Sequence, residues 1–160
     1  MIIGSISENL EYEKRVAITP EILKKYKSLG IEICLCKDYA THIGINDDDF
    51  ISEGASILDS KEEVLKKSNL ITQLNLPNEK YLNKLKSDQI LIGVLDPYRN
   101  KSKLKEMKEK KIDCFSLELL PRITRAQSMD ILSSQANLAG YKAVIDSFAF
   151  FQKAIPMMMT

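Results

Sequence analysis

The segment QILIGVL, residues 89–95, has the pattern of a β-strand that is buried on both faces. Its apolar side chains form an almost unbroken run, whereas a strand with one face in water would alternate polar and apolar residues. Such runs are typical of parallel strands in a sheet that helices cover on both sides. The segment therefore predicts an α/β fold.

Strand and helix patterns alternate on either side of this segment. We expect further strands at residues 2–3, 31–36, 55–58, 69–74 and 112–117, and helices at residues 20–29, 46–54, 60–68, 77–85, 100–111 and from about residue 125 to residue 153. This alternation predicts a three-layer, doubly wound, mostly parallel sheet of about five to seven strands, Rossmann-like or flavodoxin-like, with a long C-terminal helix.

The composition is that of an ordinary globular domain: the 160 residues are 44% hydrophobic and 28% charged. A formal net charge of +1 gives no electrostatic attraction to nucleic acid or to anionic membranes. The apolar runs are too short to cross a bilayer, and the N-terminus lacks the pattern of a signal peptide. We therefore expect a cytoplasmic protein that does not bind nucleic acid.

Common cofactor and metal motifs are missing from the sequence. There is no GxGxxG turn, no phosphate-binding P-loop and no HExxH zinc motif. Cys34, Cys36 and Cys114 read as inert, buried thiols, and His42 is the only histidine, so we expect no metal site. An α/β pattern alone does not establish nucleotide binding.

The segment PRITRAQSMDILSSQANLAGYKAV, residues 121–144, has two interpretations. Thr124 and Gln127 are spaced as a capping box, which predicts a helix that begins at Arg125. Alternatively, Gln127 and Asp130, one turn apart on the same face, belong to a ligand-binding loop. Small residues then recur along one helical face, which packs closely either on the chain's own sheet or between two domains: Ser133, Ala136, Gly140, Ala143 and Ser147.

Arg15 is a candidate anion or substrate site. It stands in the segment EKRVAITP, residues 13–20, just before a helix that we expect to start at Pro20 with Thr19 as its N-cap. A guanidinium group and the unpaired N–H groups of a helix start can together hold an anion. The alternative is a solvated surface arginine.

Two segments together resemble a known family. EYEKRVAITPE, residues 11–21, is similar to the N-terminal signature shared by alanine dehydrogenases and the alpha subunit of proton-translocating NAD(P) transhydrogenases. Residues 121–144 are similar to the transhydrogenase version. The resemblance implies that residues 1–125 are the N-terminal lobe of an NAD(H)-binding component and residues 126–160 a trailing interdomain helix. The NAD-binding Rossmann lobe that follows in the family is absent from this chain.

The resemblance also implies a cofactor site. By motif match, Arg122, Gln127, Asp130 and Ser133 lie near the nicotinamide and ribose of NAD(H), with Gln127 and Asp130 in the catalytic role. A partner subunit of the family binds NADP(H), and no metal takes part. The cofactor supplies the hydride chemistry, and the protein supplies orientation.

As part of a full complex, a member of this family transfers hydride between NADH and NADP⁺, coupled to proton translocation by membrane subunits. The resemblance implies a homodimer that is cytoplasmic and peripheral to the inner membrane through those partners. Without the Rossmann lobe, we expect this chain alone to be inactive.

Two positions depart from the relatives. Alanine dehydrogenases hold and protonate pyruvate with a lysine and a histidine, where this chain has Gln73 and Asp96. Transhydrogenases commonly keep a lysine at the position of Gln73. The replacement of the lysine and the histidine argues against an amino-acid dehydrogenase. The alternatives to a transhydrogenase lobe are an alanine or other amino-acid dehydrogenase lobe and a non-catalytic assembly fragment.

Overall fold

The computed structural model describes residues 1–153, which fall into two compact units. The first unit is Met1–Leu119 and the second begins at Leu120. The expected division at residues 125 and 126 remains a prediction, and the last segment of the expected trailing helix, residues 154–160, lies outside the described residues. None of the helices in residues 1–153 is long and apolar enough to cross a membrane.

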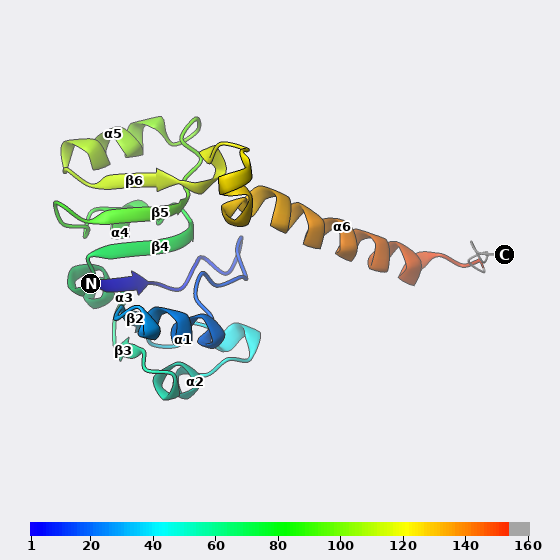
Figure 1. Cartoon of the computed structure of the whole chain (residues 1–160), viewed down its shortest axis with the longest axis horizontal. Helices are drawn as coiled ribbons and strands as arrows, with labels where there is room; N and C mark the ends of the chain where they lie inside the picture. Colours follow the sequence, from blue (N-terminus) through cyan, green and yellow to red (C-terminus); the bar gives the residue numbers. More distant parts are fainter. Residues whose placement is uncertain (154–160) are drawn as a thin grey trace. The chain divides into compact units, whose positions relative to one another are not determined.

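The first unit is built on a 6-stranded sheet in the order β3-β2-β1-β4-β5-β6 (Figure 1). All neighbouring strands are parallel, which confirms the predicted doubly wound α/β fold. The strands are β1 (Ile2–Ser5), β2 (Glu32–Cys36), β3 (Ser56–Leu58), β4 (Leu70–Asn75), β5 (Ile90–Val94) and β6 (Asp113–Ser116).

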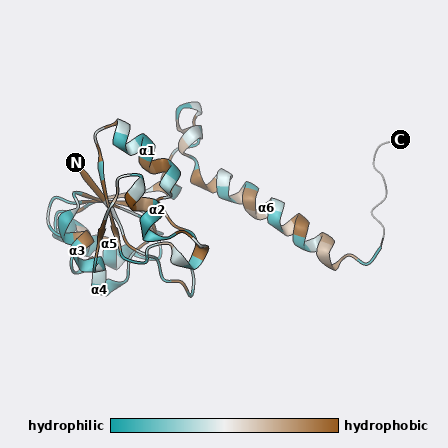
Figure 2. Ribbon diagram, turned by 90° about the horizontal axis from the view of Figure 1, so that it is seen from below, coloured by the Kyte–Doolittle hydropathy of each residue, from teal (hydrophilic) through white to brown (hydrophobic). Residues whose placement is uncertain are grey.

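Helices cover both faces of this sheet. Figure 2 shows α1 (Pro20–Ser28) and α2 (Asp47–Ser52) on one face, and α3 (Lys61–Lys67), α4 (Glu79–Leu82) and α5 (Lys101–Glu109) on the other. This arrangement follows from the strand order, because right-handed crossovers place helices on opposite faces when the chain reverses direction across the sheet. Strand β2 is buried on both faces from Ile33 to Cys36, whereas β4 and β5 alternate between buried and half-buried residues, with Ile71 and Leu91 fully inaccessible. The expectation that residues 89–95 are buried on both faces is therefore met on one face only.

Helix ends agree with the sequence to different degrees. The Ser60 hydroxyl accepts a hydrogen bond from the Glu63 N–H, as an N-cap should. Thr19 occupies the N-cap position of α1 but makes no such bond with its side chain. Helix α4 is shorter than expected and ends at Leu82, although Leu85 beyond it is still buried.

Two of the three cysteines are buried, as expected. Cys34 and Cys36 are buried, whereas Cys114 is only partly buried.

The second unit corrects the helix start that the sequence predicts. Residues Thr124–Met129 form a 3₁₀-helix without a side-chain cap, and helix α6 begins only at Ile131 and ends at Phe150. The Thr124–Gln127 capping box does not form. Asp130 is the true N-cap, because its carboxylate accepts hydrogen bonds from the Ser133 N–H at 3.0 Å and the Ser133 hydroxyl at 2.6 Å.

Helix α6 buries none of its residues. Apolar, small and polar residues are mixed along its length, as the colours of Figure 2 show. Gly140 has no atom within 4 Å of the place where a Cβ would stand. The expectation that the stripe of small side chains from Ser133 to Ser147 packs on the chain's own sheet or between two domains stays a prediction.

Gly93 should be required where β5 lies against β4. A Cβ at this position would stand 2.4 Å from the backbone oxygen of Gln73. We predict that Gly93→Ala lowers the free energy of unfolding by roughly 1–3 kcal/mol, because backbone atoms cannot move aside as a flexible side chain can. Urea unfolding followed by circular dichroism measures this change.

Gly44→Asn is a suitable control. Gly44 favours glycine for another reason, its φ of 81°, and no atom lies within 4 Å of the place where its Cβ would stand. Asparagine tolerates the left-handed conformation, so the loss should be smaller than about 1 kcal/mol. Equal urea unfolding midpoints for Gly93→Ala and the wild-type chain would show that β4 and β5 do not approach each other as closely as described.

Candidate functional site

A crevice opens at the carboxyl ends of β1 and β4. These strands lie side by side although helices α1, α2 and α3 and strands β2 and β3 come between them in the sequence. The chain therefore leaves their ends in opposite directions across the sheet. Ligands of open α/β sheets commonly bind at such a switch point. Here a cavity of about 690 Å³ is lined by residues 6–13, by Gln73 and residues 75–78, and by Lys61 and Tyr81. We refer to it as the switch-point crevice.

Gln73 closes the floor of this crevice. Its side chain is only 3% exposed, and every polar atom of its amide is used. The oxygen accepts from the Ile6 N–H at 2.7 Å and from the Ser5 hydroxyl at 3.0 Å, while the nitrogen donates to the Ile6 carbonyl and to Glu8, both at 3.0 Å. A neutral amide that is satisfied in this way neither carries charge nor transfers a proton.

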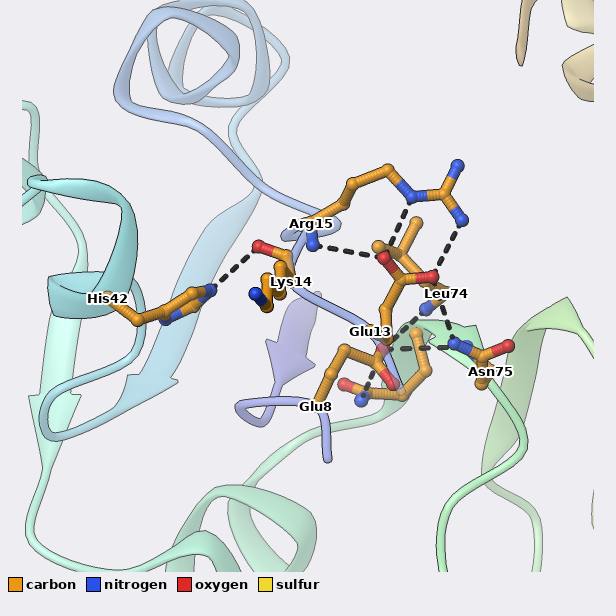
Figure 3. Close-up of polar contacts among 8 residues, drawn as sticks. Glu8, Glu13, Lys14, Arg15, His42, Leu74 and Asn75 are labelled. Atoms are coloured by element: carbon orange, nitrogen blue, oxygen red, sulfur yellow. Dashed lines mark hydrogen bonds and ion pairs between the residues drawn. The ribbon is translucent and has the colours of Figure 1, made fainter. Parts of the chain in front are cut away.

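Glu8 crosses from the loop after β1 to the end of β4 (Figure 3). One of its oxygens accepts from the Leu74 N–H at 2.7 Å and more weakly from the Asn75 N–H at 3.4 Å. Burial raises the pKa of the Glu8 carboxyl, the hydrogen bonds oppose that rise, and the nearby Glu13 charge adds to it. The side chain thus fastens the loop to the sheet.

Glu13 and Arg15 form a two-point ion pair in the same loop (Figure 3). The guanidinium donates from Nε to Oε1 at 2.8 Å and from Nη2 to Oε2 at 2.6 Å, and the Arg15 backbone N–H reaches Oε1 at 3.0 Å. These bonds lower the pKa of Glu13 to about 2 and raise the pKa of Arg15. The candidate anion site therefore already holds a carboxylate from its own chain.

Two further side chains hold the rest of this loop. His42 bonds through Nε2 to the Lys14 carbonyl at 2.7 Å (Figure 3). The buried Tyr39 hydroxyl accepts from the N–H groups of Ala17 and Ile18, and burial raises the pKa of Tyr39 to about 12. Because Ser5 gives its only hydroxyl proton to Gln73, the Tyr39 hydroxyl donates to Ser5.

Sequence reasoning missed most of this network. It singled out Arg15 and noted Gln73 only as a departure, but it did not identify Glu8, Glu13, Tyr39 or His42. The one available signal was the spacing of Glu13 and Arg15, which are two residues apart in an extended loop. Asp96 occupies a tight turn after β5, with a φ of 44°, and its side chain lies 3.6 Å from Arg99.

The second unit has a smaller hollow, of about 240 Å³, which we call the Arg122 hollow. Its lining includes three of the four residues expected to contact the cofactor, namely Arg122, Gln127 and Asp130. The fourth, Ser133, is bonded to Asp130. Those bonds, with a smaller contribution from Arg122, lower the pKa of Asp130, so this carboxylate carries its charge at neutral pH.

The Arg122 hollow offers both hydrogen-bond donors and acceptors. Arg122 and Gln127 are exposed and can donate to a carboxamide or a hydroxyl group, and Asp130 and Gln127 can accept from ribose hydroxyls. None of these groups is a strong nucleophile, so the set suits orientation of a ligand. Among residues 1–153, no group of three or more His, Cys, Asp and Glu side chains is placed to hold a metal ion.

The sequence is similar to those of known protein families. Residues 4–139 match the family described as alanine dehydrogenase/PNT, N-terminal domain. An NAD(P) transhydrogenase subunit alpha protein of Rickettsia prowazekii is 36% identical, over 100% of this chain and 43% of its own length. Alanine dehydrogenase 1 of Staphylococcus aureus is 26% identical, over 91% of this chain and 38% of its own length.

A solved transhydrogenase structure is also similar to this chain. The crystal structure of transhydrogenase from Sinorhizobium meliloti superposes with a TM-score of 0.89 at 38% identity, over 100% of this chain and 48% of that chain. The present chain therefore spans less than half the length of these relatives. Because the family model covers most of the sequence, the chain belongs to the alanine dehydrogenase/PNT N-terminal domain family, on the side of the transhydrogenase alpha subunits.

Proposed function

We propose that this chain is the N-terminal lobe of the NAD(H)-binding component of an NAD(P) transhydrogenase. In the complete assembly it serves hydride transfer between NADH and NADP⁺, coupled to proton translocation through membrane subunits, while a partner subunit binds NADP(H). The observation that carries this proposal is the likeness over the whole chain to transhydrogenase proteins, at 36% identity to the Rickettsia subunit and 38% to the Sinorhizobium structure.

The Arg122 hollow supports a role in placing the nicotinamide. NAD(H), once bound, supplies the hydride chemistry. Arg122 and Gln127 donate to its carboxamide or ribose, and Asp130 and Ser133 offer acceptors to ribose hydroxyls. Because Asp130 caps α6, the position of its carboxylate is fixed by the start of a 20-residue helix. A fixed contact suits hydride transfer, where an error of about 1 Å can cost 100-fold in rate.

The switch-point crevice argues against an alanine dehydrogenase. Gln73 is a buried and fully bonded amide, so it supplies no positive charge for a pyruvate carboxylate. Asp96 closes a turn and supplies no imidazole. In the complete protein, NADH oxidation that depends on pyruvate would favour the dehydrogenase, whereas reduction of an NADP⁺ analogue would favour the transhydrogenase.

The assembly follows from the same proposal. The chain would act beside membrane subunits, on the cytoplasmic side of the inner membrane, and as a homodimer. The NAD-binding Rossmann lobe of the family would hold the pyrophosphate and adenosine of NAD(H). A purely structural assembly fragment would instead leave the rate of hydride transfer insensitive to the side chains of the Arg122 hollow.

Gln127→Asn and Asp130→Asn should slow hydride transfer in the complete protein by about tenfold or more, and weaken NADH binding less. Both changes alter contacts that orient the nicotinamide, while the remaining nucleotide contacts persist. Asparagine is as good an N-cap as aspartate, so Asp130→Asn should keep α6 intact. Pre-steady-state transhydrogenation and NADH titration measure the two effects separately.

Asp130→Ala and Ser134→Ala are the controls for this pair. Asp130→Ala also removes the cap, so it should lose about 1 kcal/mol of helix stability in addition. The Ser134 hydroxyl donates to the Ile131 carbonyl of its own helix, and Ser134 does not line the Arg122 hollow, so its replacement should leave the transfer rate unchanged. A folded Gln127→Asn variant with the wild-type transfer rate would refute the proposed orienting role.

Glu8 and Glu13 should give opposite pH dependences of stability. The pKa of Glu13 is lowered to about 2 in the folded chain. Its contribution to the free energy of unfolding is therefore fully present above its unfolded pKa and is lost as the pH falls toward 2. Burial raises the pKa of Glu8 in the folded chain. Its contribution to the free energy of unfolding is therefore present below its unfolded pKa and is lost as the pH rises through its folded pKa.

We therefore expect the stability lost in Glu13→Gln at neutral pH to shrink as the pH approaches 2. Glu8→Gln should instead gain stability relative to the wild-type chain as the pH rises. Urea unfolding midpoints of the three proteins between acid and neutral pH test this. Parallel curves for the two variants would mean that the carboxyl groups do not have these environments.

A further inference from the structure

The chain makes a tight turn directly after β5, from Asp96 to Arg99, which we call the Tyr98 turn. The Arg99 N–H donates to the Asp96 carbonyl at 3.1 Å, and Pro97 stands at the second position, where the fixed φ of proline suits such a turn. Asn100 closes the turn, because its N–H donates to the Asp96 carbonyl at 2.9 Å and its side chain donates to the carbonyl of the preceding Leu95 at 2.9 Å. The turn is therefore held by hydrogen bonds of its own.

Asp96 has a strained backbone conformation that a neighbouring segment fixes. Its φ is 44°, in the left-handed region, although it is not a glycine and a residue before proline is normally extended. Glu118, in the 3₁₀-helix Leu117–Leu119 after β6, accepts a hydrogen bond from the Asp96 N–H at 2.6 Å. Strained conformations persist only where the surrounding structure holds them, and they cluster at functional sites. The Tyr98 turn is thus fixed before a partner arrives, and its binding would order little further chain.

The Tyr98 turn presents two side chains to solvent. Tyr98 is 85% exposed, and the Arg99 side chain is 88% exposed. The ion pair of Arg99 with Asp96 is long, at 3.6 Å, and lies at the surface, where such pairs contribute little. A solitary exposed aromatic residue is ordinary. Here, however, tyrosine and arginine, two residue types that carry much of the binding energy at protein interfaces, are neighbours on a fixed turn.

A protein surface suits this turn better than a small anion or a nucleotide phosphate does. Phosphate sites usually offer several converging N–H groups. The N–H groups of Arg99 and Asn100 already have the Asp96 carbonyl as acceptor, and the Asp96 N–H has Glu118. Pro97 has no N–H to offer. The turn therefore lacks the donors that a phosphate site needs.

The Tyr98 turn lies at the edge of the sheet that a second cofactor-binding subunit has to approach. Strands β1, β4 and β5 are parallel, so the turn lies at the same edge as the switch-point crevice, the edge to which their arrows point in Figure 1. Ligands of open α/β sheets commonly bind at this edge. In the proposed function, hydride passes between two nicotinamide rings, whose reacting atoms must come within about 3–3.5 Å of each other. A subunit that carries NADP(H) therefore has to come up to this edge.

We propose that Tyr98 and Arg99 are a docking contact for the NADP(H)-binding subunit. The Tyr98 ring enters an apolar hollow of that subunit, and Arg99 pairs with one of its carboxylates. This inference rests on the proposed function and deepens it, since it assigns a surface of the lobe to the partner. The turn lies outside residues 11–21, the segment that is similar in alanine dehydrogenases, so a contact specific to transhydrogenases can reside there.

Calorimetric titration of the complete protein with its purified NADP(H)-binding subunit, without nucleotide, measures this contact directly. Tyr98→Ala and Arg99→Ala should each weaken binding by about tenfold or more, as expected for residues at the centre of an interface. Tyr98→Phe keeps the ring and should bind within about threefold of the wild-type protein. Arg99→Lys keeps the charge but not the planar fork, so its affinity should lie between those of Arg99→Ala and the wild-type protein.

Rates of hydride transfer separate docking from chemistry. Both alanine variants should need about tenfold more of the NADP(H)-binding subunit to reach half the maximal rate, while the maximal rate and the affinity for NADH stay as in the wild-type protein. Leu29→Ala and Lys108→Ala are matched controls, because both side chains are exposed and lie at the opposite edge of the sheet, at the ends of α1 and α5. Neither control should change the affinity for the subunit.

Wild-type affinity for the subunit in folded Tyr98→Ala and Arg99→Ala would overturn the inference. A loss of NADH affinity at unchanged affinity for the subunit would also overturn it, because the turn would then serve a cofactor. If Arg99→Ala fails to fold by circular dichroism, Tyr98→Ala still decides, since within residues 1–153 the Tyr98 side chain has no hydrogen-bond partner. A wild-type protein that binds the subunit but transfers no hydride to an NADP⁺ analogue would instead refute the proposed function.

Discussion

Side chains continue the pairing of β1 and β4 beyond the last pair of residues in their ladder. That pair is Gly4 with Ile71. Further along, the Gln73 amide bonds to both the N–H and the carbonyl of Ile6, and Glu8 accepts from the Leu74 N–H. Buried backbone groups require partners, so the loop after β1 cannot leave the sheet without losing several hydrogen bonds. The positions of Glu13 and Arg15 depend on this attachment.

The two hollows consequently have different chemistry. In the switch-point crevice, Ser5, Ile6 and Glu8 satisfy the amide of Gln73, and Glu13 pairs with Arg15. These polar groups therefore hold the shape of the loop after β1. In the Arg122 hollow, Arg122 and Gln127 are exposed to a ligand, and Asp130 is fixed by its role as a helix cap. This division agrees with the proposed role, in which the Arg122 hollow would orient a nucleotide.

The sequence predicted the sheet well because continuous apolar runs are a local pattern, although β5 itself alternates between buried and half-buried residues. Apolar runs such as residues 89–95 need no knowledge of distant contacts. The helix start near residue 125 was predicted wrongly because two local caps competed, and the Asp130–Ser133 bonds prevailed over the Thr124–Gln127 capping box. The bonds of Gln73 to Ser5, Ile6 and Glu8 leave no local signal, because they join segments more than sixty residues apart.

Hydrogen exchange at the Leu74 amide reports on the attachment of the loop to β4. If the Glu8 carboxylate is its partner, the Leu74 N–H exchanges slowly in the wild-type chain and at least about tenfold faster in Glu8→Ala, which corresponds to the loss of one hydrogen bond to a charged group. Glu8→Gln, which keeps an acceptor oxygen, should retain much of the protection, and the Leu91 amide of β5 should exchange alike in all three proteins. Equal exchange of Leu74 in the wild-type chain and in folded Glu8→Ala would show that Glu8 does not hold the loop to the sheet.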